Sequence, residues 1–595
     1  MKKIITATAS FLALSCVFAF AQKFNPKVEV ENAYEGKIIQ AAKLPVSMTV
    51  PDSLYKFGYT LDYSVFDNPY KGSYIFKPYK IEMTPDPAPS GARKLFVNIG
   101  AGYSLHPELD VVYSPSIKKY PLQLSVYDNF RGFLGNYATP VMNIGTVILP
   151  ACYVFNEVDR VSPGFVLDNK IGADARYEFR KLALEFDGGY RIFGTNDDLT
   201  SHFMQMFENE LRLLPLDPNR SDYFYGARLY VNAGKDIFSA LTTGKHKMGI
   251  NNMGFEARFG VPVTNSSKAI AETGIQTIVY SGAHEAAITR VWVTPQYSVS
   301  WKGGHAALGV KVSTLMGNDN GSNMGTGEAF AHESNLLYPA VSVKQYIIPG
   351  KLAIYAKADG GDYLNCYADN LRSNPFLNPN LVIPNFDSSS ERVNARAGFE
   401  GSAWGKLRYD IHGGYALYDN WQVESAQVLQ QASATAASGY DFYLTGYYNY
   451  CDYFMYYGDA TIVWQSPRVD VDAHLLYRFV DLNDERNENF FIAPPAWQGE
   501  IKASYNWNRQ AYAGVSVAAQ SSRSGYFVVG TAPQLEQGWF HVKGFVDLGV
   551  FGSYAIKPSW TVWLKSGNLL GHCVQNYFLH PEHGPYVTLG MSFNL

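Results

Sequence analysis

Three features are scarce in this sequence, and each absence excludes a class of protein. After residue 21 no segment reaches the roughly 18 uninterrupted apolar residues of a spanning helix, so helical membrane spans are not expected. Basic residues do not exceed acidic ones, and the net charge of -4 with a pI near 6.3 indicates no nucleic-acid partner. No GxSxG motif marks a serine nucleophile on a sharp turn.

Cysteines are also few and widely spaced. Four follow residue 21, namely Cys152, Cys366, Cys451 and Cys573, and none belongs to a CxxC pair. This spacing does not indicate a disulfide framework. One or two disulfide bridges could still form in an oxidising compartment.

The first residues predict export. A basic start, Met1–Lys3, precedes an apolar run over Ile4–Phe20 and a small-residue cleavage site at Ala19-Phe20-Ala21. This pattern is typical of a secretory signal peptide, here residues 1–21. A buried N-terminal helix is the alternative; a lipoprotein signal is disfavoured because Cys16 lies inside the apolar run.

Alternation of apolar and polar residues is the main signal in the rest of the chain. Aromatic residues make up 15% of the sequence, with 43 tyrosines, which is typical of strands that meet lipid on one face and water on the other. In one example, the apolar residues Val469, Val471, Ala473, Leu475, Tyr477 and Phe479 alternate with Asp470, Asp472, His474, Leu476 and Arg478, most of which are polar. Successive side chains of a strand point to opposite faces. The polar residues predicted to face a wet lumen are Asp470, Asp472, His474, Arg478, Lys502, Asn506, Arg408, Asp410 and Arg396.

Short and long joins alternate along the same region. Short joins are expected near 556, 509, 466, 402–403 and 347–350, and long ones over 522–537, 481–496, 421–451, 361–389 and 315–334, with one strand over 538–555. A soluble sandwich would rarely extend so far as one unit. We therefore predict an all-β, transmembrane antiparallel β-barrel over residues 94–595. It should have about 18–22 strands, short periplasmic turns and long extracellular loops.

The last hairpin carries a resemblance to a known family. Its motifs are Trp560-Thr561-Val562-Trp563-Leu564, Gly567-Asn568-Leu569-Leu570, His580-Pro581, Gly584 and the closing run Tyr586–Leu595. These resemble the barrels of TonB-dependent receptors and their relatives in the Bacteroidota. The resemblance implies that Tyr586, Phe593 and Leu595 form the closing-strand signal, with Phe593 or Leu595 in place of the family's usual final Phe.

The start of the chain also looks like a set of Bacteroidota outer-membrane proteins, through Asn68-Pro69-Tyr70-Lys71-Gly72 and Gly102-Tyr103. Residues 22–93 are predicted to form a periplasmic or luminal segment of short strands and proline-rich turns. By the resemblance, this segment is too short for a recognisable plug domain. Val28-Glu29-Val30 is more simply a short strand than an energy-coupling box.

Two groups of polar residues have side chains that could bind a metal or act as acid and base. His572, His580, Glu582 and His583 could hold a metal, but a polar surface loop is the favoured interpretation. Asp470, Asp472 and His474 lie in line on one strand face, about 7 Å apart by strand geometry, which is too far for a hydrogen-bonded dyad. No catalytic, cofactor or metal site is predicted, and the chain is not expected to be an enzyme.

Two functions of different classes follow. The first is transport of a solute across the outer membrane of a Gram-negative bacterium, as a receptor-like barrel or a channel. The second is a non-transporting barrel that scaffolds or helps to assemble other envelope proteins. Expected partners are outer-membrane lipids and lipopolysaccharide, and the barrel-assembly machinery during insertion. A periplasmic or lipoprotein partner is left open.

Overall fold

The computed structural model describes residues 94–117, 120–139, 160–197, 199–215, 224–240, 243–322, 336–378, 388–432, 440–482, 492–507, 510–529, 536–571, 574–577, 579–582 and 584–595. The predicted signal peptide, the segment 22–93, Cys152, Cys573, His572 and His583 lie outside these residues.

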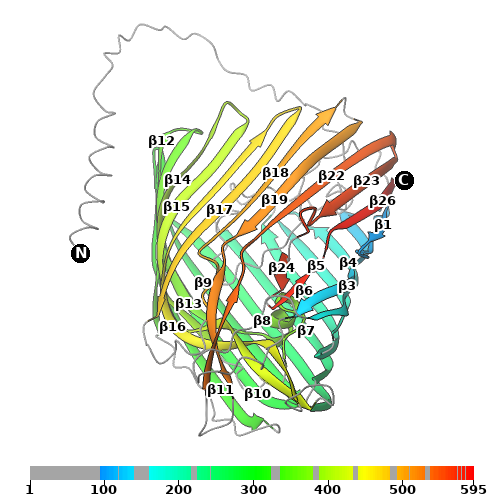
Figure 1. Ribbon diagram of the computed structural model, residues 1–595. Coiled ribbons are helices and arrows are strands. Elements are labelled where there is room, and N and C mark those ends of the chain that lie inside the picture. The colour runs from blue at the N-terminus through cyan, green and yellow to red at the C-terminus, as the bar shows by residue number, and fades with distance from the viewer. Residues whose placement is uncertain are drawn as a thin grey trace, which may run out of the picture. The chain divides into compact units, whose positions relative to one another are not determined.

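The described residues form strands and one short helix (Figure 1). The first thirteen strands are β1 (Leu95–Tyr103), β2 (Glu108–Tyr113), β3 (Leu122–Thr139), β4 (Arg160–Glu178), β5 (Leu182–Asn196), β6 (Thr200–Pro215), β7 (Phe224–Ala240), β8 (Thr243–Thr264), β9 (Ser267–Gly282), β10 (His284–Trp301), β11 (Gly304–Ser322), β12 (Leu337–Ile348) and β13 (Leu352–Leu364). After helix α3 (Tyr367–Ser373) come β14 (Ser388–Ala403), β15 (Leu407–Ala432), β16 (Tyr440–Gln465), β17 (Val469–Leu482), β18 (Trp497–Trp507), β19 (Ala511–Gln520), β20 (Arg523–Val529), β21 (Glu536–Val542), β22 (Phe545–Lys557), β23 (Trp560–Gly567), β24 (Val574–Tyr577), β25 (His580–Glu582) and β26 (Tyr586–Asn594).

The strands close into one antiparallel barrel. Each of β1–β18 pairs with the next strand, β19 then pairs with β22, β22 with β23, and β23 with β26, which returns to β1. This ring has 22 strands, and the predicted antiparallel barrel of 18–22 strands is confirmed. The short pairs β20–β21 and β24–β25 lie in connections between ring strands. Among the described helical residues, none forms a helix long and apolar enough to span a membrane.

The predicted alternation places apolar side chains on the outside. On β6, Met204 and Met206 are buried, whereas Phe203 and Phe207 on either side of them are 43% and 59% exposed. Leu475 and Phe479 are likewise exposed on β17. A period of two in the sequence therefore becomes two faces of one wall, with large apolar side chains on the outer face.

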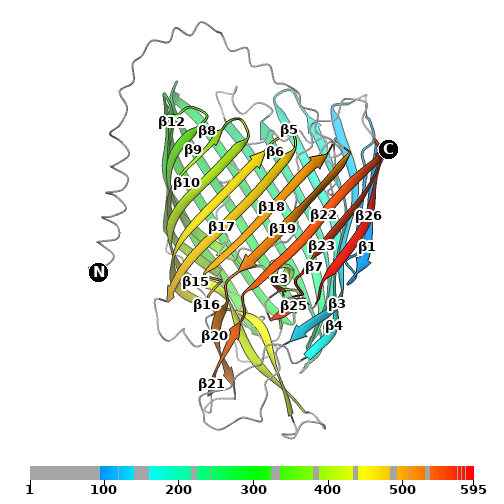
Figure 2. The same ribbon diagram turned by 45° about the horizontal axis from the view of Figure 1, so that its top comes forward.

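Connections differ between the two ends of the barrel. At the end that holds the C-terminus, β12–β13, β14–β15 and β22–β23 are joined within residues 349–351, 404–406 and 558–559. At the opposite end, shown at the bottom of Figure 2 with α3 inside it, residues 365–387 join β13 to β14. Yet residues 197–199, 241–242 and 283 make brief joins at that same end between β5 and β10. This part of the rim therefore has no long loop of its own.

Two predicted joins differ from the structure. The loop expected over 421–451 is wrong: β15 and β16 continue as a paired hairpin to Ala432 and Tyr440. The hairpin bends at a register shift between Tyr418 and Trp421, where Asn420 has φ 45°. It persists because each strand's backbone groups are satisfied by its partner even beyond the ring.

The single strand expected over 538–555 is also wrong. It is divided into β21, which pairs with β20 outside the ring, and β22, which pairs with β19. A Cβ at Gly544 would lie 2.5 Å from the carbonyl oxygen of Gln520, so glycine permits the close crossing where the chain changes partner.

The seam between the first and last strands is built by specific contacts. Phe96 pairs with Asn594 and Tyr103 with Val587 in register. Across the seam, Trp563 Nε1 donates to Asn98 Oδ1 at 2.6 Å. The backbone N–H of Leu595 donates to the Leu95 carbonyl at 2.8 Å. The C-terminal residue is thus part of the barrel closure.

Candidate functional site

One connection turns into the barrel instead of away from it. Residues 365–378, here called the mouth segment, leave β13, form α3 and continue to Asn378. The backbone N–H groups of Asp369 and Asn370 donate to the Cys366 carbonyl at 3.0 Å, which starts the helix. Tyr367 and Leu371 are spaced by four residues and share the buried face of α3.

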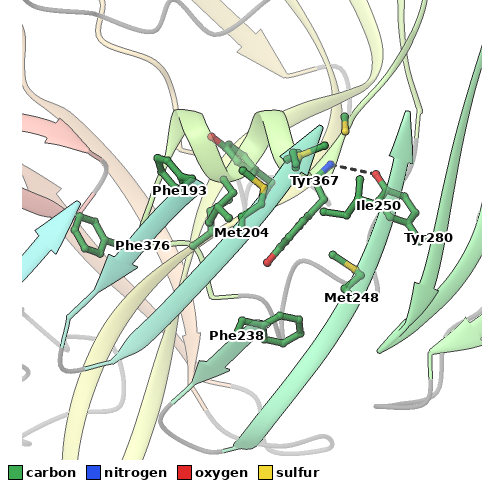
Figure 3. Packing of buried hydrophobic residues seen from close by; sticks show 14 of the residues in the cluster. Phe193, Met204, Phe238, Met248, Ile250, Tyr280, Tyr367 and Phe376 are labelled. Atoms are coloured by element: carbon green, nitrogen blue, oxygen red, sulfur yellow. Dashed lines mark hydrogen bonds between the residues drawn. The ribbon is translucent and has the colours of Figure 1, made fainter. Parts of the chain in front are cut away.

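The mouth segment packs on the inner face of five neighbouring strands. Its Tyr367, Leu371 and Phe376 belong to one buried cluster. The wall contributes Phe193, Met204, Phe238, Met248, Ile250 and Tyr280, drawn in Figure 3. The Tyr280 hydroxyl accepts the backbone N–H of Tyr367 at 3.1 Å. Burial of apolar side chains at about 25 cal/mol per Å² holds this segment against the wall.

A buried polar network fixes the segment in register. Asp236 Oδ2 accepts from the Tyr367 hydroxyl at 2.7 Å and faces His202 Nδ1 at 2.9 Å. His202 Nε2 in turn faces the carbonyl oxygen of Leu377 at 3.0 Å. If Asp236 is ionised, both neighbours of the imidazole, the Asp236 carboxylate and the Leu377 carbonyl, are acceptors and not donors. The network is then fully satisfied when both ring nitrogens carry protons.

A second connection reaches the same place. In the β23–β26 loop, His580 Nε2 lies 2.8 Å from Asp197 Oδ2 in the brief β5–β6 join. The His580 ring stacks on Phe376 of the mouth segment, with centroids 4.4 Å apart and an interplanar angle of 16°. Glu582 pairs in register with Tyr137 of β3. The two inward connections therefore share one packed interface.

Asp197 is held as a carboxylate in the β5–β6 join. Burial alone would raise its pKa, but the hydrogen bond from His580 and the backbone N–H groups of Thr200 and Leu199 outweigh burial. The net effect lowers the pKa of Asp197 from its usual 3.8.

The mouth segment contacts both the ring and the hairpin that extends beyond it. On one side, Thr195 Oγ1 of β5 donates to the Pro375 carbonyl at 2.9 Å. On the other, the Asn378 N–H donates to the Gly446 carbonyl of β16 at 3.2 Å, and Ser373 Oγ lies 2.9 Å from the Tyr448 hydroxyl. Both β16 residues lie where the β15–β16 hairpin continues beyond the ring. The segment, which begins after β13 and reaches β5, therefore lies across the mouth of the barrel.

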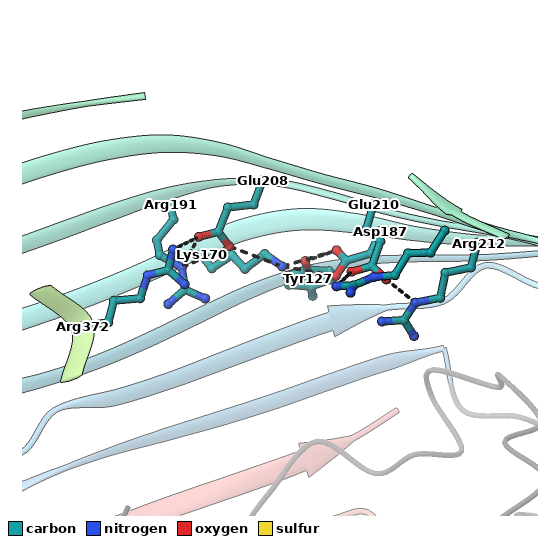
Figure 4. A network of polar contacts seen from close by, with 9 residues as sticks. Tyr127, Lys170, Asp187, Arg191, Glu208, Glu210, Arg212 and Arg372 are labelled. Atoms are coloured by element: carbon teal, nitrogen blue, oxygen red, sulfur yellow. Dashed lines mark hydrogen bonds and ion pairs between the residues drawn. The ribbon is translucent and has the colours of Figure 1, made fainter. Parts of the chain in front are cut away.

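A chain of charges continues along the inner wall from α3 (Figure 4). Arg372 of α3 contacts Glu208 of β6 at 3.0 Å, and Glu208 also contacts Arg191 of β5 at 3.2 Å. Lys170 of β4 lies 3.3 Å from Asp187, which also accepts from the Tyr127 hydroxyl at 2.7 Å. Both signs of charge thus alternate on the wall beside the mouth segment.

The residues proposed from sequence lie on a different part of the wall. They occupy β14, β15, β17 and β18. Those on β17 lie on the face opposite the exposed Leu475, Tyr477 and Phe479. Six of them make side-chain contacts: Arg396 with Asp359 at 3.8 Å, Asp410 Oδ1 with the Tyr355 hydroxyl at 2.7 Å, Arg408 with Gln465 at 2.6 Å, Asp470 with the N–H of Ser466 at 3.3 Å, His474 with Asp459 at 2.9 Å, and Lys502 with Glu500. In the strand register, Asp472 lies opposite Lys502 and Asn506 lies opposite Tyr512. Arg478 is buried. No described contact joins them to the mouth segment.

The proposed closing-strand residues all lie at the seam. Tyr586 is buried against the His106 ring at 4.2 Å, and Phe593 packs on Trp560 at 4.5 Å. Leu595 is exposed at its side chain but bonded through its backbone. Whether they act as an assembly signal stays a prediction.

The expected histidine cluster is divided. His580 is buried against Asp197, whereas Glu582 lies 3.6 Å from His106. The interpretation as an exposed polar loop is therefore wrong for His580. No group of three metal-binding side chains gathers in the part of the chain that the structure describes. Sequence reasoning missed His202, Asp236 and Tyr367, because they come from strands and a loop far apart in the chain.

Two of the four cysteines after residue 21 lie in the part of the chain that the structure describes. These two, Cys366 and Cys451, are both buried and free.

No protein-family model and no curated protein matches this chain. Solved structures match in fold. The copper transporter OprC has 12% identity over 86% of this chain and 81% of its own, with a TM-score of 0.56. A mutant ferric enterobactin receptor, PfeA, from Pseudomonas aeruginosa has 9% identity over 84% and 81%, with a TM-score of 0.57. The pyoverdine outer membrane receptor FpvA from Pseudomonas aeruginosa PAO1 has 10% identity over 85% and 79%, with a TM-score of 0.58. At this identity the likeness shows the fold: a 22-strand barrel shared with outer-membrane receptors and a transporter.

Proposed function

We propose that this chain lies in the outer membrane and moves a solute across it, with the end that carries the mouth segment facing the cell exterior. The observation that carries the proposal is a closed 22-strand barrel crossed at one end by an inward connection beside a charged inner wall. The similar folds of OprC, PfeA and FpvA, named as transporter or receptors, support the same class of function.

Orientation follows from the chain ends and the connections. Both ends of the described chain lie at the seam opposite the mouth segment, and bacterial barrels keep their termini and brief turns on the periplasmic side. The polar face that includes Asp470, His474 and Lys502 would then line the water-filled lumen, because a charged residue facing lipid at mid-membrane costs about 2–4 kcal/mol.

The segment 22–93 precedes β1 and would enter from the periplasmic side. We propose that it is periplasmic or luminal and that it regulates passage together with the mouth segment. Its length, about half that implied by the family resemblance for a full plug, makes energy coupling a separate question from conductance.

The experiment is a planar-bilayer conductance measurement on four purified proteins. They are the mature chain, a variant lacking residues 22–93, a variant with 366–378 replaced by a short Gly-Ser linker, and the combination. We expect low conductance from the mature chain and stepwise ion conductance when the mouth segment is replaced, with the largest steps from the combination. Replacement of residues 526–540 by a short turn, in the β20–β21 connection outside the ring, serves as the control and should change little. Silence from all four proteins would refute transport through this lumen.

A further inference from the structure

A hollow of about 860 Å³ lies on the wall formed by β5–β9. Its lining includes Tyr190, Gln205, Phe207, Lys235, Lys247 and Asn251. These side chains come from four consecutive strands, so the hollow is a property of the wall and not of one loop.

The register places the hollow on the outer face. Gln205 pairs with Lys235, and Lys235 with Gly249. Gln205 shares its side of β6 with the exposed Phe203 and Phe207, opposite the buried Met204 and Met206. A Cβ at Gly249 would lie 2.5 Å from Ser281 Oγ, so the glycine leaves space in the hollow beside β9. The hollow therefore opens away from the lumen, toward the lipid.

The charge of this patch is of one sign. Lys235, Lys247 and the exposed Lys245 lie on β7 and β8 near the end that carries the mouth segment. No carboxylate is among the lining residues. Lysines on a lipid-facing wall are tolerated near the membrane interface and not at its centre.

Apolar side chains continue from Lys235 along the wall, away from the mouth end. Phe207, Val231 and Leu229 are exposed there on the same outer face. A ligand with an anionic head and apolar tails would meet ammonium groups and apolar surface at once.

We propose that this hollow binds the phosphate head group of an anionic lipid of the outer leaflet, with its acyl chains along Phe207, Val231 and Leu229. The assignment to the outer leaflet rests on the orientation given under the proposed function. The ammonium groups of Lys235 and Lys247 supply the charge-assisted hydrogen bonds to the phosphate.

The test uses the full mature chain in detergent and native mass spectrometry. The protein is titrated with phosphorylated lipid A, with dephosphorylated lipid A and with phosphatidylcholine. Wild type should retain the phosphorylated lipid in preference to the other two. The double variant K235Q/K247Q should bind it at least tenfold more weakly, since two charge-assisted contacts are lost. The control K268Q/K302Q, which removes two exposed lysines at the other end of the barrel, should bind as wild type does.

Three results would overturn the proposal. These are equal binding by K235Q/K247Q and wild type, equal binding of lipid A with and without phosphate, and displacement of the lipid by millimolar inorganic phosphate, which would identify a site for free phosphate. The outcome is independent of transport. A protein that binds the lipid through these lysines but never conducts ions keeps this inference and loses the proposed function.

Discussion

Replacement of Tyr367 by Phe tests directly whether the mouth segment is a closed and separable element. The change removes one hydroxyl, which donates to Asp236 at 2.7 Å in a fully buried setting, and keeps the ring that fills the cluster. A hydrogen bond to a charged group contributes about 1.5–3 kcal/mol. At 1.4 kcal/mol per tenfold, the equilibrium between the closed and open segment should shift toward open by about 10- to 150-fold.

Cys366 reports that equilibrium. It begins the mouth segment and is buried, and burial raises the pKa of its thiol to about 12. Since the thiolate is the reactive form, modification by a maleimide requires the open segment. In a chain with the other mature cysteines changed to serine, we expect the labelling rate of Tyr367→Phe to exceed that of the parent by about 10- to 150-fold.

A matched control separates this effect from general loosening of the barrel. Tyr355 donates to Asp410 Oδ1, also at 2.7 Å, with the same chemistry on the β13–β15 side of the wall. Tyr355→Phe should leave the labelling rate of Cys366 unchanged. An unchanged rate in Tyr367→Phe, or an equal rise in both variants, would refute the reasoning.

Three further predictions concern the loops and the seam. Phe376→Ala removes the ring that stacks on His580 and meets Tyr137 edge-on, and at about 3–5 kcal/mol for a core Phe it should raise the labelling rate of Cys366 more than Tyr367→Phe does. Because the pKa of Asp197 is lowered, the stabilisation that its contact with His580 gives to the β23–β26 loop is present above pH 3.8 and is lost as the pH falls through the lowered pKa. Pepsin should therefore cleave this loop only below pH 3.8. In Asp197→Asn, cleavage should occur above pH 3.8 as well. Gly102→Ala places a Cβ 1.8 Å from the carbonyl oxygen of Val587 in the seam and should lower barrel stability by about 1–3 kcal/mol in urea unfolding, while Gly458→Ala, which meets no atom within 4 Å, should have a far smaller effect.

The barrel could be predicted because its signal is local. Each strand of a membrane barrel repeats apolar and polar residues at a period of two, and every strand reports this independently of its neighbours. β17 and β18 therefore lie close to their predicted bounds, at Val469–Leu482 and Trp497–Trp507. Errors arose where the chain continued as strand without continuing in the ring, as in the β15–β16 hairpin and at the β21–β22 boundary. Alternation of apolar and polar residues identifies a strand but not the strand with which it pairs.

The candidate site could not be predicted in the same way. Its central contact joins His202 on β6, Asp236 on β7 and Tyr367 on the mouth segment, and Tyr367 lies 131 residues from Asp236. Asn- and Pro-rich sequence over 361–389 is typical of an outward loop, and only the spacing of Tyr367 and Leu371 hints at a buried helical face. The charged residues that alternation did identify, such as Asp470 and His474, lie on the wall and not at the mouth.

The brief joins between β5 and β10 explain where the mouth segment rests. Because these strands end in connections as short as the single residue Ala283, their inner rim offers apolar side chains such as Phe193, Met204 and Tyr280 that no loop of their own covers. A connection from β13 reaches across and buries them, and His580 and Phe376 tie it to the last loop. The closed state is thus stabilised by at least two buried charge-assisted contacts, Tyr367–Asp236 between the mouth segment and β7 and His580–Asp197 between the last loop and the β5–β6 join, each worth about 1.5–3 kcal/mol if its partner group would otherwise be solvated. A solute that opens the mouth must therefore bind the open state about 10²- to 10⁴-fold more tightly than the closed one to make opening favourable. Such a preference requires contacts with the loops themselves, and passive diffusion along the charged wall cannot supply it.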